Sequence, residues 1–122
     1  MKKTILLVED NEANSTLVRD ILTYYGYEVI GAMNGEEGVK LAIELIPDLI
    51  IMDIQMPVMN GFDAMALIKA NPETKAIKLL VMTSFAMEGD RERMLASGAD
   101  GYLSKPINTR ELPALIGALL GD

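Results

Sequence analysis

Five short apolar runs alternate with five amphipathic stretches along the chain, and this alternation constrains the fold more than any other feature of the sequence. Three of the runs are dense in isoleucine, leucine and valine and show no polar alternation, which is typical of strands buried on both faces of a sheet. The stretches between the runs repeat their apolar residues every three to four positions, which predicts amphipathic helices. The predicted strands are Ile5–Val8, Val29–Met33, Leu49–Met52, Leu79–Met82 and Gly101–Leu103.

Each amphipathic stretch has one apolar face, and three asparagines mark expected helix starts. Asn34, Asn60 and Asn108 stand at N-cap positions, and an acidic residue follows each of them three positions later. The methionines Met33, Met52 and Met82 are expected in the core. The faces expected to be buried are formed by Leu17, Val18, Ile21, Leu22 and Tyr25; Val39, Ala42, Ile43 and Ile46; Phe62, Met65 and Ala66; Met87, Met94 and Leu95; and Leu112, Leu115, Ile116, Leu119 and Leu120.

Repeated strand–helix units predict a parallel sheet with helices on both faces, because right-handed crossovers place them there. Five such units fit an α/β, doubly wound, flavodoxin-like (βα)5 fold with strand order 2-1-3-4-5. The 122 residues contain no linker or low-complexity tract, so residues 1–122 are expected to form a single domain without an output domain. In such folds ligands bind beyond the carboxyl ends of the strands.

Composition excludes several classes of function. The chain has neither cysteine nor histidine, so a metal would bind through oxygen, which favours Mg²⁺ or Mn²⁺. The net charge of −7 leaves little material for a basic nucleic-acid-binding face. The apolar runs are far shorter than the roughly 20 residues that span a bilayer, and acids follow the first run, so we expect a cytoplasmic protein without a signal peptide.

Functional groups follow four of the five predicted strands. Glu9 and Asp10 follow the first strand, Asp53 the third, Thr83 the fourth and Lys105 the fifth. Each residue alone fits an ordinary polar turn, but three carboxylates at one edge of a sheet would repel one another strongly without a cation among them. A divalent cation with a lysine would also neutralise a phosphoryl group carried by Asp53, and the threonine hydroxyl could bind a phosphoryl oxygen.

Four segments together resemble the receiver domain of two-component response regulators, over essentially the whole chain. In order, they are Ile5–Asn11, Asp48–Gly61, Val81–Ala86 and Gly98–Pro106. Each segment alone is moderately specific, whereas all four at these spacings form a specific pattern.

The resemblance implies that Asp53 is the phosphoacceptor and that it accepts its phosphoryl group from a sensor histidine kinase or a histidine phosphotransfer protein. It implies that Asp10 binds Mg²⁺ directly, that Glu9 lies close by and acts through water, and that the backbone carbonyl of Gln55 is a further ligand. Asp53 would share this metal. The chain would then catalyse only its own phosphorylation and dephosphorylation.

The resemblance also implies that Thr83 and Lys105 contact the phosphoryl group and that the Lys105–Pro106 peptide bond is cis. Tyr102 would be a switch aromatic that swings inward as Thr83 moves. A downstream protein would bind the face formed by the fourth helix, the fifth strand and the fifth helix.

Two residues depart from the commonest pattern. Glu9 replaces the more usual aspartate, so its carboxylate reaches one methylene further. Phe85, two residues after Thr83, would impede the attacking water and prolong the phosphorylated state.

Three alternatives stay open on the sequence alone. The chain could be a receiver from a hybrid histidine kinase or a larger regulator. A small flavodoxin would need a phosphate-binding loop after the first strand, where the acids from Glu9 to Glu12 would instead repel a phosphate. An aspartyl-phosphate phosphatase would carry an acid at the position of Gln55.

Overall fold

The computed structural model describes residues 2–54, 61–83, 92 and 95–121, and its centre is a five-stranded parallel sheet. The strand order is β2-β1-β3-β4-β5, which confirms the order predicted from the alternation. All four strand pairs are parallel. The strands are β1 (Thr4–Val8), β2 (Glu28–Ala32), β3 (Leu49–Asp53), β4 (Lys78–Thr83) and β5 (Gly101–Ser104).

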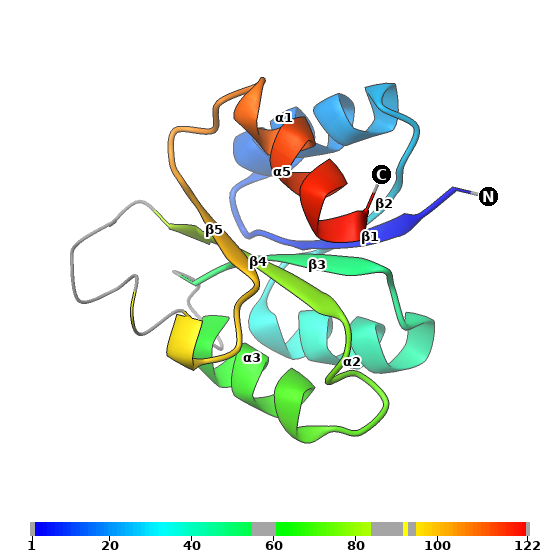
Figure 1. Cartoon of the computed structure of the whole chain (residues 1–122), viewed down its shortest axis with the longest axis vertical. Coiled ribbons are helices and arrows are strands. Elements are labelled where there is room, and N and C mark those ends of the chain that lie inside the picture. The colour runs from blue at the N-terminus through cyan, green and yellow to red at the C-terminus, as the bar shows by residue number, and fades with distance from the viewer. Residues whose placement is uncertain (1, 55–60, 84–91, 93–94, 122) are drawn as a thin grey trace.

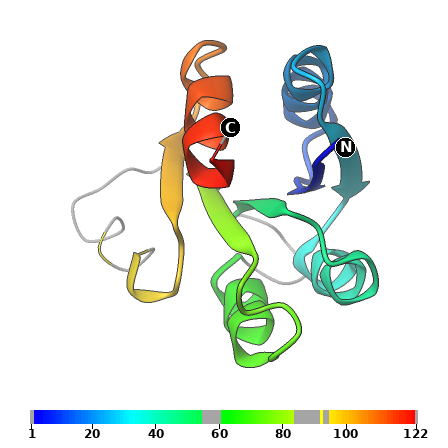
Figure 2. The ribbon, with the colours of Figure 1, turned by 45° about the vertical axis from the view of Figure 1, so that its right-hand side comes forward.

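Helices cover both faces of the sheet, as expected for strand–helix repeats. Helices α1 and α5 lie on one face, whereas α2 and α3 lie on the other (Figures 1 and 2). The helices are α1 (Glu12–Tyr24), α2 (Gly35–Leu45), α3 (Gly61–Ala70) and α5 (Glu111–Leu120). The helix predicted around Met87 and Met94 falls largely outside the described residues, although Leu95 is helical. No helix among the described residues is long and apolar enough to cross a membrane.

The core consists of two layers, one on each side of the sheet. Leu6 and Val8 of β1 pack into the layer beneath α2 and α3, whereas Ile5 and Leu7 pack into the layer beneath α1 and α5. All four side chains are fully buried, because each face of this central strand is covered by helices. Burial on both faces explains why the central strands read as unbroken apolar runs.

Of the asparagines predicted to begin helices, Asn34 does so and Asn108 lies ahead of its helix. Asn34 Oδ1 accepts a hydrogen bond from Glu37 N at 2.9 Å, which confirms the predicted cap of α2. Helix α5 begins at Glu111 and its N-cap is Arg110, so the cap predicted at Asn108 is wrong, although Asn108 Oδ1 still accepts a hydrogen bond from Glu111 N at 3.0 Å. The predicted cap at Asn60 lies outside the described residues.

Several residues predicted to be buried face solvent instead. Strand β2 ends at Ala32, so Met33 lies beyond the strand and is 57% exposed, whereas Met52 and Met82 are fully buried as predicted. Strand β2 lies at the edge of the sheet, and within the described residues no strand lies beyond it. Helix residues that extend past β2 therefore have no sheet to pack against. The other predicted core residues that are exposed are Leu17, Tyr25, Ile43, Ile46, Ala66 and Leu95.

Candidate functional site

The parallel register brings the predicted functional residues to one edge of the sheet. Asp53 is the last residue of β3 and pairs with Met82, the residue before Thr83. Thr83 is the last residue of β4, pairs with Ser104 and accepts a backbone hydrogen bond from Lys105 N at 2.8 Å. Glu9 follows β1 directly, and its backbone N–H donates to Ala32 O of the neighbouring strand at 3.0 Å. The prediction that the residues following these parallel strands meet at one edge of the sheet is thereby confirmed.

Lys105 joins two carboxylates within this edge. Its Nζ lies 2.8 Å from Asp53 Oδ2 and 3.0 Å from Glu9 Oε1. Both carboxylate side chains are almost fully buried, and the Lys105 side chain is 14% exposed. The peptide bond between Lys105 and Pro106 is cis, the isomer that the receiver resemblance implies. Short contacts in a buried setting make this a strong, charge-assisted arrangement.

Burial and charge shift the protonation of both partners of this contact. Burial raises the pKa of Glu9 from 4.5 to about 7, and nearby Asp53 adds to the increase, whereas Lys105 partly offsets it. Burial by itself would lower the pKa of Lys105, but the hydrogen bonds and charges of Asp53 and Glu9 outweigh it and raise the pKa. The lysine is therefore a permanent cation at neutral pH.

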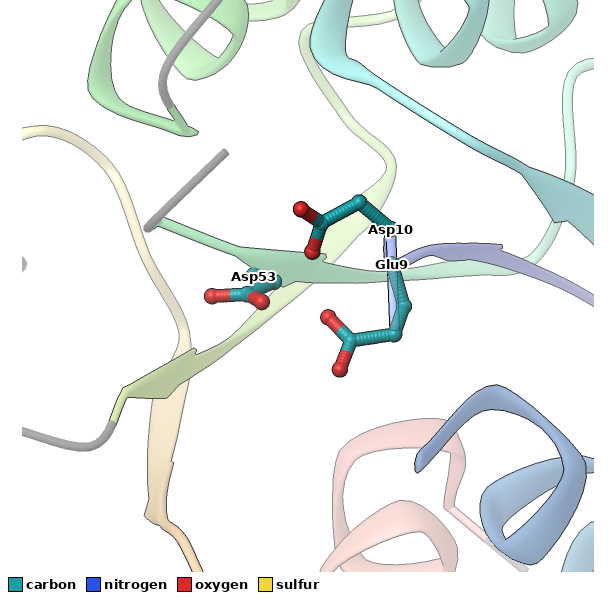
Figure 3. A group of neighbouring side chains, drawn as sticks. All are labelled: Glu9, Asp10 and Asp53. Atoms are coloured by element: carbon teal, nitrogen blue, oxygen red, sulfur yellow. The ribbon is translucent and has the colours of Figure 1, made fainter. Parts of the chain in front are cut away.

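Glu9, Asp10 and Asp53 form a cluster of three carboxylates (Figure 3). One oxygen from each residue lies within 4.8 Å of the others. Asp10 is exposed, whereas Glu9 and Asp53 are buried. Glu9 Oε2 is buried without any hydrogen-bond partner, and such an atom is costly unless something polar or cationic satisfies it. The cluster therefore fits a hard divalent cation bound through oxygen.

Some of the predicted site residues lie as expected and others differ in detail. Thr83 is fully buried beside this edge, and Tyr102 of β5 is half-buried against the core. The direct contact between Glu9 and Lys105 was not predicted from the sequence, whereas the expectation that Glu9 reaches the metal through water stays a prediction. Gln55 and Phe85 lie outside the described residues.

Two further residues near the site were missed by reasoning from the sequence. Asn11 caps α1 directly after the acidic pair, and its Oδ1 accepts a hydrogen bond from Asn14 N at 3.0 Å. An asparagine before an amphipathic stretch was a signal for this cap. Gly61 packs on the backbone next to Asp53, and no spacing rule indicates that contact.

Comparison with known proteins shows which family the chain belongs to. The model of the response regulator receiver domain matches residues 5–117. The chain belongs to this family. It is therefore a receiver domain of two-component signalling, and the match assigns it to receivers rather than to flavodoxins.

Individual relatives agree with this assignment. The receiver is 43% identical to the polar-differentiation response regulator DivK of Brucella anthropi, over all of this chain and 99% of that protein. Among solved structures, it resembles chemotaxis protein CheY4 of Vibrio cholerae, with a TM-score of 0.93 and 30% identity over 98% of this chain and 100% of that one.

A second solved structure bears on the metal. The receiver domain of the sensor histidine kinase PA1611 from Pseudomonas aeruginosa has a TM-score of 0.92 and 34% identity, with both chains covered completely. That structure has a magnesium ion coordinated in its active-site cleft.

Proposed function

We propose that this receiver is a phosphorylation-activated switch that carries its phosphoryl group on Asp53. The observation that supports the proposal most directly is the buried Asp53 carboxylate, 2.8 Å from Lys105 Nζ and beside two further acids. The donor is the phosphohistidine of a sensor kinase or a phosphotransfer protein. An Asp53 oxygen attacks phosphorus, the phosphorus–nitrogen bond breaks, and the imidazole leaves and takes up a proton from solvent.

The residues around Asp53 position and stabilise the transferring group. Asp10 and Asp53 would hold Mg²⁺, which supplies positive charge for the phosphoryl oxygens. Lys105 supplies a second cation without reorganisation, because its ammonium group already lies beside the attacking carboxylate. The buried hydroxyl of Thr83 would donate a hydrogen bond to a phosphoryl oxygen once the group is in place.

The charge balance explains why phosphorylation is tolerated in a buried site. With Glu9, Asp10 and Asp53 ionised, the three charges of −1 are balanced by Lys105 and a divalent cation. The acyl phosphate replaces one charge of about −1 by about −2, so the site changes by only about one unit. That change is the signal which the rest of the domain must read.

The test is phosphorylation by acetyl phosphate with Mg²⁺, followed by intact-mass measurement. We expect one phosphate on the wild-type chain and none on Asp53→Asn. The exposed Asp20 on α1 offers a matched control, and Asp20→Asn should be phosphorylated like the wild type. Equal incorporation in Asp53→Asn would refute the assignment. The purified chain should release no phosphate continuously from an unrelated phosphomonoester, since we propose no turnover of external substrates.

The output of the switch is proposed to pass from Thr83 to Tyr102 on the neighbouring strand. Tyr102 lines a groove of about 600 Å³ together with Ser104 of β5 and residues of α5. A cytoplasmic protein partner that binds this groove better in the phosphorylated state would receive the signal. The similarity to the response regulator DivK supports a role in two-component signalling for this switch.

The switch is tested by adding beryllofluoride to the wild type and to Thr83→Ala and recording NMR shifts. In the wild type we expect shifts to extend from the site to residues 101–105. In Thr83→Ala, beryllofluoride should still bind at Asp53, but the shifts at 101–105 should shrink at least about twofold. Shifts of full size at Tyr102 in Thr83→Ala would show that another route carries the signal.

A further inference from the structure

Gly61, the first residue of α3, packs directly on the backbone that carries Asp53. A Cβ atom at Gly61 would lie 2.5 Å from Ile54 Cα, 2.8 Å from Ile54 Cγ2 and 2.9 Å from Asp53 O. Real Cβ atoms essentially never approach other heavy atoms within 3.0 Å. Two of these three contacts involve backbone atoms, so a side-chain rotation cannot relieve them. Any larger residue would displace the chain at Asp53 and Ile54.

The same contact lies within a short series of backbone hydrogen bonds. Gly61 N donates to Ile54 O at 3.2 Å, and Ile54 N donates to Met82 O at 3.2 Å. Met82 pairs with Asp53 in the sheet and immediately precedes Thr83. The start of α3 is therefore tied to the residue after Asp53 and, through it, to the end of β4.

We propose that Gly61 is a positioning residue for the phosphorylation of Asp53, an inference that rests on the proposed function. Its bare Cα lets α3 hold the backbone of Asp53 and Ile54 where the Asp53 carboxylate meets Lys105 at 2.8 Å. Phosphoryl transfer depends on this placement, because displacing a reacting atom by about 1 Å can cost about a hundredfold in rate.

The experiment compares Gly61→Ala with the wild type and with two control variants. In Gly31→Ala, the new methyl group meets only the flexible guanidinium group of Arg19, so the site is undisturbed. Ile68→Ala removes a buried side chain seven residues further along the same helix α3 and adds no atom at Gly61, so it tests a loss of core stability without the Gly61 clash.

Two measurements are made on each variant. The first is amide hydrogen exchange of Ile54 in the metal-free protein, and the second is the maximal rate of phosphorylation by acetyl phosphate at saturating Mg²⁺. For Gly61→Ala we expect Ile54 exchange to accelerate at least about tenfold relative to the amides of β1, and the maximal rate to fall at least about tenfold. Gly31→Ala should match the wild type, and Ile68→Ala should accelerate exchange in the core without a selective effect at Ile54.

A double variant, Gly61→Ala with Ile54→Ala, separates backbone contacts from side-chain contacts. It removes Ile54 Cγ2 and leaves the contacts to Ile54 Cα and Asp53 O. We expect it to fold and to stay slow in phosphorylation. Recovery of the wild-type rate in the double variant would overturn the proposal, and so would failure of both variants to fold. Absence of phosphate on wild-type Asp53 would instead refute the proposed function, while Ile54 exchange would still report on Gly61.

Discussion

Neutralising Glu9 should change how the stability of the metal-free protein depends on pH. Glu9 is buried, its Oε2 has no partner, and it lies beside two other carboxylates. Its pKa rises from 4.5 to about 7 because of burial first and Asp53 second. The folded state therefore binds the Glu9 proton more tightly than the unfolded state does. In Glu9→Gln the side chain no longer titrates, so this pH-dependent contribution to stability is lost.

The direction follows from linkage between proton binding and folding. A carboxyl whose pKa is raised by folding contributes its full stability below the unfolded pKa and loses it as pH rises through the folded pKa. For Glu9 this window runs from 4.5 to about 7. Each pKa unit is worth about 1.4 kcal/mol, so the loss reaches at most about 3 kcal/mol. Lys105 does not contribute in this window, because its pKa lies above 10.5.

Thermal unfolding with EDTA at several pH values measures the effect. Relative to the wild type, Glu9→Gln should gain stability from about pH 5 and level off above about pH 7, at about 3 kcal/mol. For a domain of this size, that corresponds to roughly 10 °C in the unfolding midpoint. Glu28→Gln, which changes an exposed acid at the start of β2, should parallel the wild type at every pH.

Mg²⁺ provides an internal check on the same measurement. A cation bound among the carboxylates favours their ionised forms, so saturating Mg²⁺ should flatten the pH dependence of the wild type. At about 100 times its dissociation constant it should add about 2.7 kcal/mol of stability. If the curves of Glu9→Gln and the wild type stay parallel across this pH range without Mg²⁺, the reasoning about Glu9 is wrong.

Two further predictions concern stability away from the site. Thr74 is fully buried, and its hydroxyl donates to Ile68 O at 2.6 Å, so Thr74→Val should lower the free energy of unfolding by about 1–2 kcal/mol in urea titrations; an unchanged value would mean that this hydrogen bond contributes nothing. Ile46 follows α2 as its C-cap in the left-handed region (φ 46°, ψ 65°), a conformation that strains a residue with a Cβ atom, and its side chain is about half exposed. Ile46→Gly should therefore raise the free energy of unfolding by about 1 kcal/mol in the same titrations. A decrease would contradict the argument that Ile46 is strained.

The order of the strands and the place of the site could be predicted from the sequence. Unbroken apolar runs indicate strands covered on both faces, and only helices between consecutive parallel strands provide that cover. Once the sheet is parallel, residues that follow the strands must meet at one edge. That argument alone brought Asp53, Thr83 and Lys105 together, and the register confirms it.

Helical periodicity predicted which residues share a helix face, but not how much of each face is buried against the sheet. Tyr25 and Ile43 belong to apolar faces by spacing, yet both are exposed. Their helices flank the edge strand β2, where the layered core ends. Whether a side chain beside β2 is buried depends on whether another strand or helix lies beyond this edge of the sheet. The sequence of the helix itself does not contain that information.

The contacts inside the site were decided by the tertiary structure. Glu9 and Lys105 are separated by 96 positions, and their 3.0 Å contact depends on the side-chain length of Glu9 and on how closely β1 and β5 approach across β3 and β4. The packing of Gly61 against Ile54 likewise depends on the angle at which α3 meets the sheet. Residue types and spacing determine which groups reach the edge, whereas distances of a few ångströms are set by the packing of the whole chain, because each element's position depends on all the others.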